Sequence, residues 1–392
     1  MDRLKKCPVS DICGGCSLQH LSYEEQLQLK QDKMDKLFSK MIKVKKIIGA
    51  DDPYHYRNKV QMAFSYDRKR VICGNYVEST HHIVEVKDCQ ISDSLANSII
   101  ETIKKLAISF KVSIFNEYSY QGCLRHVMVR LSKSTGQVMV ILVTGSFVFP
   151  RKKDFMNKLL QAHPQITTIV QSINNRHTSM VLGEKFETWY GKGYIEDELN
   201  GLTFKISPSS FYQVNSSQTV KLYGCAIEAA DLKKDEVVID AYCGTGTIGL
   251  SLASRVKKVI GVELNKDAIK DAKINAKING ITNAEFICAD AGNYMQKTLA
   301  NKQKVDVLIM DPPRSGADDK FLKAVVKLKP KKIVYISCNP YTQKENVRFL
   351  LNNDYKLESV QPVDMFPFTD HVETVAVLSR VKEKSKFDHI GR

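Results

Sequence analysis

A glycine-rich turn between an apolar strand and a helical stretch constrains the fold of this 392-residue chain more than any other feature. The segment "EVVIDAYCGTGTIGLSLAS" places Gly244, Gly246 and Gly249 in the pattern G-x-G-x-x-G, which lets a backbone turn tightly beside a ligand and a helix pack closely on its strand. From about residue 205 onward, further apolar strands alternate with helical stretches, as in a parallel sheet with crossover helices. The sequence therefore predicts an α/β domain with a Rossmann-like sheet.

The residues around this turn indicate which cofactor it binds. The glycine pattern alone is typical of NAD, and Glu263 ends the next strand where a carboxylate would accept ribose hydroxyls of either cofactor. Asp240 discriminates between the two, because a carboxylate at the end of the first strand would repel a pyrophosphate and would suit the cationic methionine end of S-adenosylmethionine. We expect S-adenosylmethionine and keep an NAD-dependent oxidoreductase as an alternative that nicotinamide binding would revive.

Two later strands also end in carboxylates. Asp290 ends "AEFICAD" and could accept from an adenine amino group, and Asp311 begins "DPPRSG" at the edge where ligands of open α/β sheets bind. Isolated carboxylates are more often surface residues, but successive strand ends beside a glycine turn favour ligand contact. Arg314 follows the two prolines where methyltransferases of exocyclic amino groups usually carry an aromatic residue, which argues against amino-group methylation.

One cysteine, Cys338, ends the next apolar strand, "KKIVYISCNP". A thiol that only fills the core is expected inside a strand, whereas this one comes last and precedes a proline turn. From position alone, a buried thiol and a nucleophile presented to a substrate are equally good interpretations.

Length and pattern predict more than one domain. The segment "SYEEQLQLKQDKMDKLFSKMI" has a helical rhythm, and Ser22 with Glu25 would suit its N-terminal cap. Alternating segments such as "KVQMAFSY" and "QVMVILVTG" predict antiparallel strands between residues 54 and 150. We expect three parts: residues 1–50 with a cysteine segment and a basic helix, a β-rich central domain at 51–205, and the α/β domain at 206–392.

The charge balance favours a polyanionic partner. The chain has 58 Lys and Arg against 43 Asp and Glu, a formal net charge of +15, and residues 30–46 hold seven lysines against two aspartates. Such a balance favours nucleic acid, although a lysine-rich helix is often just a solvated face. Because no signal-peptide core or membrane-length apolar run is present, we expect a cytoplasmic protein with no membrane partner, working as a monomer.

Ten cysteines in a cytoplasmic chain are expected to be metal ligands, nucleophiles or core residues rather than disulfides. Cys7, Cys13 and Cys16 form C-x5-C-x2-C, a spacing that excludes the C-x3-C-x2-C triad of radical S-adenosylmethionine enzymes. A fourth ligand must come from farther along the chain, and four thiolates can hold either zinc or a four-iron cluster. The candidates for that ligand are Cys89, Cys73 and Cys123, and we expect Cys225, Cys243 and Cys288 to be core residues.

Taken together, the motifs resemble those of the RNA 5-methyluridine (uracil-5-) methyltransferases. The segments "SPSSFYQVN", "DAYCGTG", "DPPRSG", "SCNP" and "DMFPFTDHVET" occur in the family's order and at roughly its spacing, and "CPVSDICGGCSLQHLSYEEQLQLK" resembles the iron–sulfur segment of the 23S rRNA type. The resemblance covers nearly the whole chain. It implies a class I S-adenosylmethionine-dependent methyltransferase domain preceded by an iron–sulfur segment and a β-rich RNA-binding domain. The chain departs from the family pattern around Glu345 and Asn346 and at Phe368 and Asp370.

The resemblance implies a role for each motif residue. Cys338 would add to carbon 6 of uracil so that carbon 5 can take the methyl group, and Glu373 of "HVETVAVL" would remove the carbon 5 proton. Phe211 would be an aromatic near the site, and Asp311 would contact either the cofactor or the uracil. The implied cofactor contacts are Gln213, Tyr242, Thr247, Glu263, Asp290 and Asp311.

The same resemblance selects Cys89 as the fourth cysteine ligand and a [4Fe-4S] cluster over zinc, in a structural or RNA-orienting role. Because bacterial members acting on tRNA commonly lack the cluster cysteines, it favours 23S rRNA, with tRNA as the alternative substrate. Only six residues precede Cys7, so we expect no N-terminal oligonucleotide-binding barrel. A catalytically silent iron–sulfur RNA-binding protein is a further alternative, which the presence of both Cys338 and Glu373 disfavours.

Overall fold

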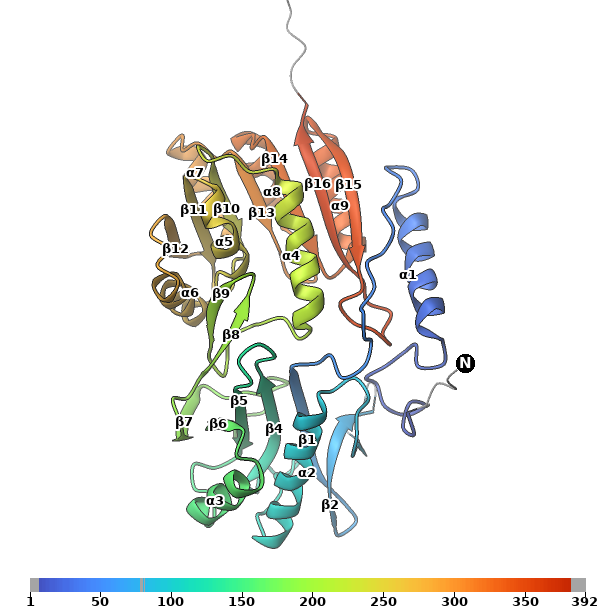
Figure 1. The fold of residues 1–392 in the computed structure, drawn as a ribbon, viewed down its shortest axis with the longest axis vertical. Coiled ribbons are helices and arrows are strands. Elements are labelled where there is room, and N and C mark those ends of the chain that lie inside the picture. Colours follow the sequence, from blue (N-terminus) through green and yellow to red (C-terminus); the bar gives the residue numbers. More distant parts are fainter. Residues whose placement is uncertain (1–6, 78–79, 81, 382–392) are drawn as a thin grey trace, which may run out of the picture. The chain divides into compact units, whose positions relative to one another are not determined.

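The computed structural model describes residues 7–77, 80 and 82–381, and it divides into two compact units (Figure 1). Unit 1 comprises Met1–Gln26, Ala50–Thr219 and Phe366–Asp370, and unit 2 comprises Leu27–Gly49, Val220–Met365 and His371–Arg392. These units interleave along the chain, whereas we had expected three consecutive parts. In particular, residues 206–219 group with unit 1, although the sequence pattern had assigned them to the methyltransferase domain.

The described elements have the following bounds. The helices are α1 (Tyr23–Phe38), α2 (Ser94–Ser109), α3 (Lys152–Ala162), α4 (Ser216–Ala230), α5 (Thr247–Leu252), α6 (Lys266–Ile278), α7 (Ala291–Ala300), α8 (Asp319–Leu328) and α9 (Pro340–Leu351), with a 3-10 helix at Ala253–Arg255. The strands are β1 (Lys59–Asp67), β2 (Arg70–Tyr76), β3 (Ile83–Glu85), β4 (Leu124–Leu131), β5 (Val138–Thr144), β6 (Ile166–Ile173), β7 (Lys185–Tyr190), β8 (Ile195–Leu199), β9 (Leu202–Ile206), β10 (Val237–Ala241), β11 (Lys258–Glu263), β12 (Ala284–Cys288), β13 (Val307–Met310), β14 (Lys332–Ser337), β15 (Tyr355–Val363) and β16 (Glu373–Arg380).

Unit 1 is built on a sheet of order β3-β2-β1-β4-β5-β6-β7. Its neighbouring strands are antiparallel, as the alternating sequence pattern predicted, except for β5 and β6, which run parallel because α3 connects them. Strands β4 and β5 are buried along their whole length, and residues of α2 and α3 such as Ile99 and Phe155 pack against them in one apolar cluster. The period-2 pattern did not reveal these two helices.

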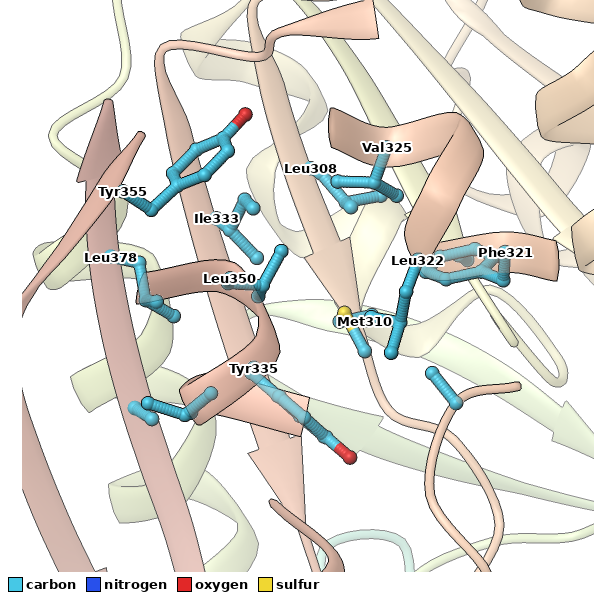
Figure 2. Close-up of a cluster of buried hydrophobic side chains, with 14 of the residues drawn as sticks. Leu308, Met310, Phe321, Leu322, Val325, Ile333, Tyr335, Leu350, Tyr355 and Leu378 are labelled. Carbon is cyan, nitrogen blue, oxygen red and sulfur yellow. The ribbon is translucent and has the colours of Figure 1, made fainter. Parts of the chain in front are cut away.

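Unit 2 has the expected Rossmann-like sheet, of order β12-β11-β10-β13-β14-β16-β15. Strands β10 to β14 pair in parallel, and the hairpin β15–β16 adds antiparallel to β14. One face is covered by an apolar cluster, in which Figure 2 shows Leu308 of β13 beside Val325 of α8, and Ile333 of β14 beside Leu350 of α9. The parallel order places the carboxyl ends of five strands at one edge, where such sheets bind ligands.

Helix α1 begins with the expected cap. The backbone N–H of Ser22 donates to Glu25 Oε2 at 2.7 Å, and that of Glu25 donates to Ser22 Oγ at 3.3 Å. The predicted basic helix over residues 30–46 is shorter than expected, since α1 ends at Phe38. Lys30 is also buried, at 1% exposure, and its Nζ lies 2.7 Å from Asp364 Oδ1, so it is a core ion pair rather than part of a solvated face.

No helix in the described ranges is long and apolar enough to cross a membrane.

Candidate active site

The glycine turn connects β10 to α5 through backbone conformations that favour glycine. Gly246 has φ +81°, and a Cβ there would lie 2.8 Å from the Phe286 ring. Gly249, in the first turn of α5, lies so close to β10 that a Cβ would be 2.8 Å from Asp240 Oδ2. Tyr242 adopts a left-handed φ of +63° although it is not glycine. This strained turn therefore brings the α5 backbone directly onto the carboxylate of Asp240.

Asp240 is buried, and only one of its two carboxylate oxygens has a hydrogen-bond partner among the described residues. Its Oδ2 accepts from the Gly249 N–H at 2.8 Å, whereas its Oδ1 has no hydrogen-bond partner among the described residues. Burial, with smaller contributions from Asp311 and Glu263, raises the Asp240 pKa to about 7. An orphaned carboxylate oxygen at this edge fits a cationic or hydrogen-bond-donating ligand, as the methionine end of S-adenosylmethionine is.

The other expected cofactor residues lie at the ends of neighbouring strands. Glu263 ends β11 and accepts from the backbone N–H of Gly244 at 3.2 Å and of Asn265 at 2.8 Å, so it also closes the glycine turn. Asp290 follows β12, which ends two residues earlier, and its Oδ1 caps α7 by accepting from Asn293 N at 2.9 Å. Both carboxylates have structural roles that their positions in sequence did not reveal.

Tyr242 and Thr247 flank the same turn. The Tyr242 ring packs at a tilt on Phe321, with 5.5 Å between ring centroids, and Thr247 opens α5 with a nearly buried side chain. Together with Asp240, Glu263 and Asp290, these residues surround the carboxyl ends of β10, β11 and β12. Gln213 belongs to unit 1, where it is buried and its backbone oxygen accepts from Asn58 Nδ2 at 3.0 Å.

The two expected catalytic residues are brought together by an antiparallel pair of strands. The ladder between β14 and β16 ends at the pair Ser337 and Thr374, so the next two opposed positions are Cys338 and Glu373. Because β16 runs antiparallel, its first residue lies at the carboxyl end of β14. Asp311 directly follows β13, the parallel neighbour of β14 on the other side, and reaches the same edge.

Electrostatic interactions connect these groups. Burial raises the pKa of Glu373, and the Asp311 carboxylate adds to the shift; burial also raises the pKa of Asp311. Burial, then Glu373 and Asp311, raise the pKa of the Cys338 thiol, while Arg314 opposes them. Arg314 is therefore the cationic neighbour of the nucleophile. No local sequence pattern predicts this role, because the two residues are far apart along the chain.

Hydrogen bonds fix the turn that carries Cys338. Asn339 caps α9 by accepting from Tyr341 N at 3.1 Å, and its Nδ2 donates to the backbone oxygen of Arg314 at 2.9 Å. Thr374 Oγ1 donates to Gln343 Oε1 at 2.7 Å and lies 3.3 Å from the Ser337 oxygen. The nucleophile turn, the Arg314 turn and the start of β16 are thus held by one network.

The four cysteines selected by the resemblance gather in unit 1 as free, partly buried thiols. Cys7 and Cys16 each interact electrostatically with both Cys13 and Cys89, whereas the rivals Cys73 and Cys123 have no cysteine among the groups that shift their pKa. Burial raises the Cys16 pKa to about 11. Even so, no group of three or more His, Cys, Asp or Glu in the described ranges is positioned to hold a metal ion. The four thiols share one region, but without ligating geometry.

The remaining cysteines differ from the expectation in part. Cys243 is buried as expected, but Cys225 is half-buried and Cys288 is exposed at the end of edge strand β12. Asn346, at one of the departures from the family pattern, accepts from the Tyr335 hydroxyl and from Ala317 N, each at 2.9 Å, and so supports the turn after Asp311.

Comparisons with known proteins show the family of the chain. The sequence profile described as tRNA (uracil-5-)-methyltransferase matches residues 22–381. An uncharacterized RNA methyltransferase of Oceanobacillus iheyensis is 44% identical over 373 residues, which cover 94% of this chain and 81% of that protein. One of Staphylococcus aureus is 44% identical over 379 residues, covering 95% and 83%.

A solved structure is similar over nearly the whole chain. The tRNA (uracil-54, C5)-methyltransferase of Pyrococcus abyssi, in complex with S-adenosyl-L-homocysteine, aligns with a TM-score of 0.78 and 31% identity, over 94% of this chain and 86% of that one. The chain belongs to the tRNA (uracil-5-)-methyltransferase family. It is an S-adenosylmethionine-dependent RNA methyltransferase, which sets aside the NAD-dependent alternative.

Proposed function

We propose that the protein methylates carbon 5 of a uridine in RNA through a covalent adduct between Cys338 and carbon 6. The observation that carries this proposal is the opposed placement of Cys338 and Glu373 at the end of the β14–β16 ladder, with Asp311 at the same edge. A thiol and a carboxylate in this relationship can act in turn on the two adjacent carbons of one pyrimidine ring.

The residues would work in sequence. The Cys338 thiolate adds to carbon 6, and the electrons of the 5,6 double bond move to the O4 enolate, which makes carbon 5 nucleophilic. S-adenosylmethionine, bound beside Asp240, Glu263, Asp290, Tyr242 and Thr247 of unit 2, would supply the methyl group to carbon 5 and leave as S-adenosylhomocysteine. Glu373 then takes the proton from carbon 5, the double bond forms again, and the carbon–sulfur bond breaks to free Cys338. The raised pKa of Glu373 suits a base.

The variant Cys338→Ala tests the nucleophile. Incubated with labelled S-adenosylmethionine and RNA from a strain lacking the protein, it should form no 5-methyluridine while it still binds S-adenosylhomocysteine. Cys288→Ala is the matched control, because that thiol is exposed at the edge of the same sheet. Undiminished turnover by Cys338→Ala would rule out the covalent route.

The RNA substrate is proposed separately. We infer 23S rRNA from the resemblance of the cysteine segment, and the name of the Pyrococcus abyssi enzyme favours tRNA as the second candidate. Mass-spectrometric mapping of 5-methyluridine in both RNAs, from strains with and without the protein, separates the two. If 5-methyluridine is lost only from tRNA in the strain without the protein, tRNA and not 23S rRNA is the substrate.

We also propose that Cys7, Cys13, Cys16 and Cys89 hold a [4Fe-4S] cluster with a structural or RNA-orienting role, since methyl transfer needs no redox step. Their mutual electrostatic interactions support this ligand set, because metal binding would neutralise thiolates that otherwise repel one another. Iron and acid-labile sulfide measured after anaerobic purification test it. Stoichiometric zinc without sulfide would replace the cluster by a zinc site, and full iron content in Cys89→Ala would remove that ligand.

A further inference from the structure

Three cations of unit 1 lie together with no carboxylate between them. Lys59 of β1 and Arg130 of β4 are directly opposed in the antiparallel register, so their side chains share one face of the sheet. Arg57, two residues before Lys59, and Arg130 both interact with Lys59 electrostatically. None of the three makes an ion pair with any residue that the structure describes. Like charges in opposed positions weaken a sheet, so this arrangement is unfavourable for folding alone.

Buried hydrogen-bond donors of these cations also lack a partner among the residues that the structure describes. Arg130 is only 5% exposed, and its Nη2 donates to the Ser210 oxygen at 2.6 Å, but its Nε and the Nε of Arg57 are buried without a hydrogen-bond partner among the described residues. Burial first, and then the two guanidinium groups, lower the Lys59 pKa to about 8. Burying unpaired charge is costly, so such groups normally have a partner.

Arg125 of the same strand shows how this protein satisfies a buried arginine. It is as buried as Arg130, at 4% exposure, and its Nη2 lies 2.7 Å from Glu117 Oε2 while its Nε lies 2.7 Å from Oε1. Arg57 interacts electrostatically with the Cys16 thiol, but neither Lys59 nor Arg130 forms an ion pair with a carboxylate among the described residues. The difference points to an anion from outside the protein as the partner of this group of cations.

We propose that Arg57, Lys59 and Arg130 form a binding site for a phosphate of the RNA backbone. This proposal rests on the proposed function, in that RNA is the substrate. Guanidinium groups donate in a fork that matches phosphate oxygens, and a lysine adds a point charge beside them. Lys59 and Arg57 are both partly exposed, so a ligand can reach the cluster.

The surrounding hydrogen bonds tie this site to the motif "SPSSFYQVN". Besides the bond from Arg130 to Ser210, Asn58 N donates to the Val214 oxygen at 2.8 Å, and Asn58 Nδ2 donates to the Gln213 oxygen at 3.0 Å. Phe211, next to Ser210, is 64% exposed. A phosphate held by the three cations therefore has an open aromatic ring in the adjacent segment on which a base can stack, as single-stranded nucleic acid sites commonly provide.

Lys59→Gln tests the proposal in the full-length protein, because no hydrogen bond of the Lys59 side chain occurs among the described residues. Fluorescence anisotropy with a labelled single-stranded oligouridylate should show about a tenfold loss of affinity, and the slope of log Kd against log salt should fall by about 0.7. Lys59→Arg should restore both. Lys153→Gln, an exposed lysine on α3, is the control and should bind within about twofold of the wild type.

A thermal unfolding series separates binding from structure. Removing one of three mutually repelling cations should leave the unfolding midpoint of Lys59→Gln unchanged or higher, while its RNA affinity falls. A lower midpoint with unchanged affinity and salt slope would overturn the site. If inorganic phosphate at equal ionic strength raises the wild-type midpoint as much as the oligouridylate does, the ligand is free phosphate and the RNA assignment is overturned.

The two proposals fail in distinguishable ways. Absence of 5-methyluridine formation by the wild-type protein would refute the proposed function, and the anisotropy measurement would still decide whether these cations bind RNA. Normal methylation by the wild type, together with an unchanged salt slope in Lys59→Gln, would refute the phosphate site alone.

Discussion

Cys338 and Glu373 are the first opposed residues beyond the last pair, Ser337 and Thr374, of two antiparallel strands. This relationship depends on the direction of β16. A parallel strand in the same place would begin at the opposite edge of the sheet, far from the end of β14. The antiparallel hairpin β15–β16 therefore places a carboxylate beside the nucleophile of an otherwise parallel sheet.

Replacing the carboxylate of Glu373 should stop the reaction after methyl transfer and before Cys338 is released. Glu373→Gln keeps the shape of the side chain but cannot take the carbon 5 proton, so the protein–RNA adduct should accumulate and migrate slowly on a denaturing gel. Glu345→Gln is the control, since Glu345 is an exposed partner of Arg348 on α9 and should release its product. A Glu373→Gln variant that turns over without an adduct would assign the proton transfer to another group.

The reactivity of Cys338 should depend on pH through its neighbours. Because burial, Glu373 and Asp311 raise the pKa of this thiol above its usual value of 9.0, the thiolate should form only as the pH rises into the alkaline range. Alkylation by iodoacetamide, followed peptide by peptide with mass spectrometry, measures this, and exposed Cys288 serves as the reference.

Two variants should shift that profile in opposite directions. Arg314→Gln removes the cation that stabilises the thiolate and should move alkylation of Cys338 to higher pH. Glu373→Gln removes a negative charge and should move it to lower pH. If the pH dependence of Cys338 alkylation is the same in both variants as in the wild type, burial alone sets the reactivity of the thiol.

Gly249→Ala should damage the cofactor site. The new Cβ would lie 2.8 Å from Asp240 Oδ2 and 3.0 Å from Val259 Cγ1, so the hydrogen bond from Gly249 N to Asp240 should be lost. We expect S-adenosylhomocysteine affinity by calorimetry to fall at least about tenfold and stability to fall by about 1–3 kcal/mol. Gly224→Ala in α4 is the control: its Cβ would meet nothing within 4 Å, so this helix should gain about 0.5–1 kcal/mol.

The stability contributed by Lys30 and Asp364 should depend on both residues of this buried ion pair being present. Lys30→Met would remove the Lys30 cation from the buried Asp364 carboxylate and should cost about 3–5 kcal/mol in urea unfolding. The double variant Lys30→Met/Asp364→Asn should recover part of that loss. If the double variant is less stable than Lys30→Met by the full cost of a second buried change, the two residues act independently.

The sequence predicted which residues of the candidate site lie at strand ends. Asp240, Glu263, Asp311 and Cys338 each close an apolar run, and parallel strands bring such ends to one edge. It could not predict contacts set by tertiary packing. Three such contacts join residues that no local pattern connects: the electrostatic interaction of Arg314 with Cys338, the hydrogen bond from Thr374 to Gln343, and the buried ion pair of Lys30 with Asp364.

The cation cluster illustrates the same limit. Arg57 and Lys59 stand close in the sequence, but Arg130 joins them only through the register of β1 and β4. The lysine content of the sequence instead favours residues 30–46, of which Lys30 is a core residue. Net charge suggested the type of partner, and only strand pairing located a place for it.

The network from Thr374 through Gln343 to the backbone of β14 has a consequence for motion during turnover. Glu373 begins a strand that is paired on both sides, with β14 and with β15, and Cys338 follows directly from a strand in the same ladder. Glu373 stands in a strand, and Cys338 stands in a short turn between β14 and α9 that the hydrogen bonds of Asn339 hold in place. In the proposed reaction, the geometric change between addition and elimination therefore falls on the pyrimidine, whose carbon 5 and carbon 6 pass from planar to tetrahedral and back between two stationary groups.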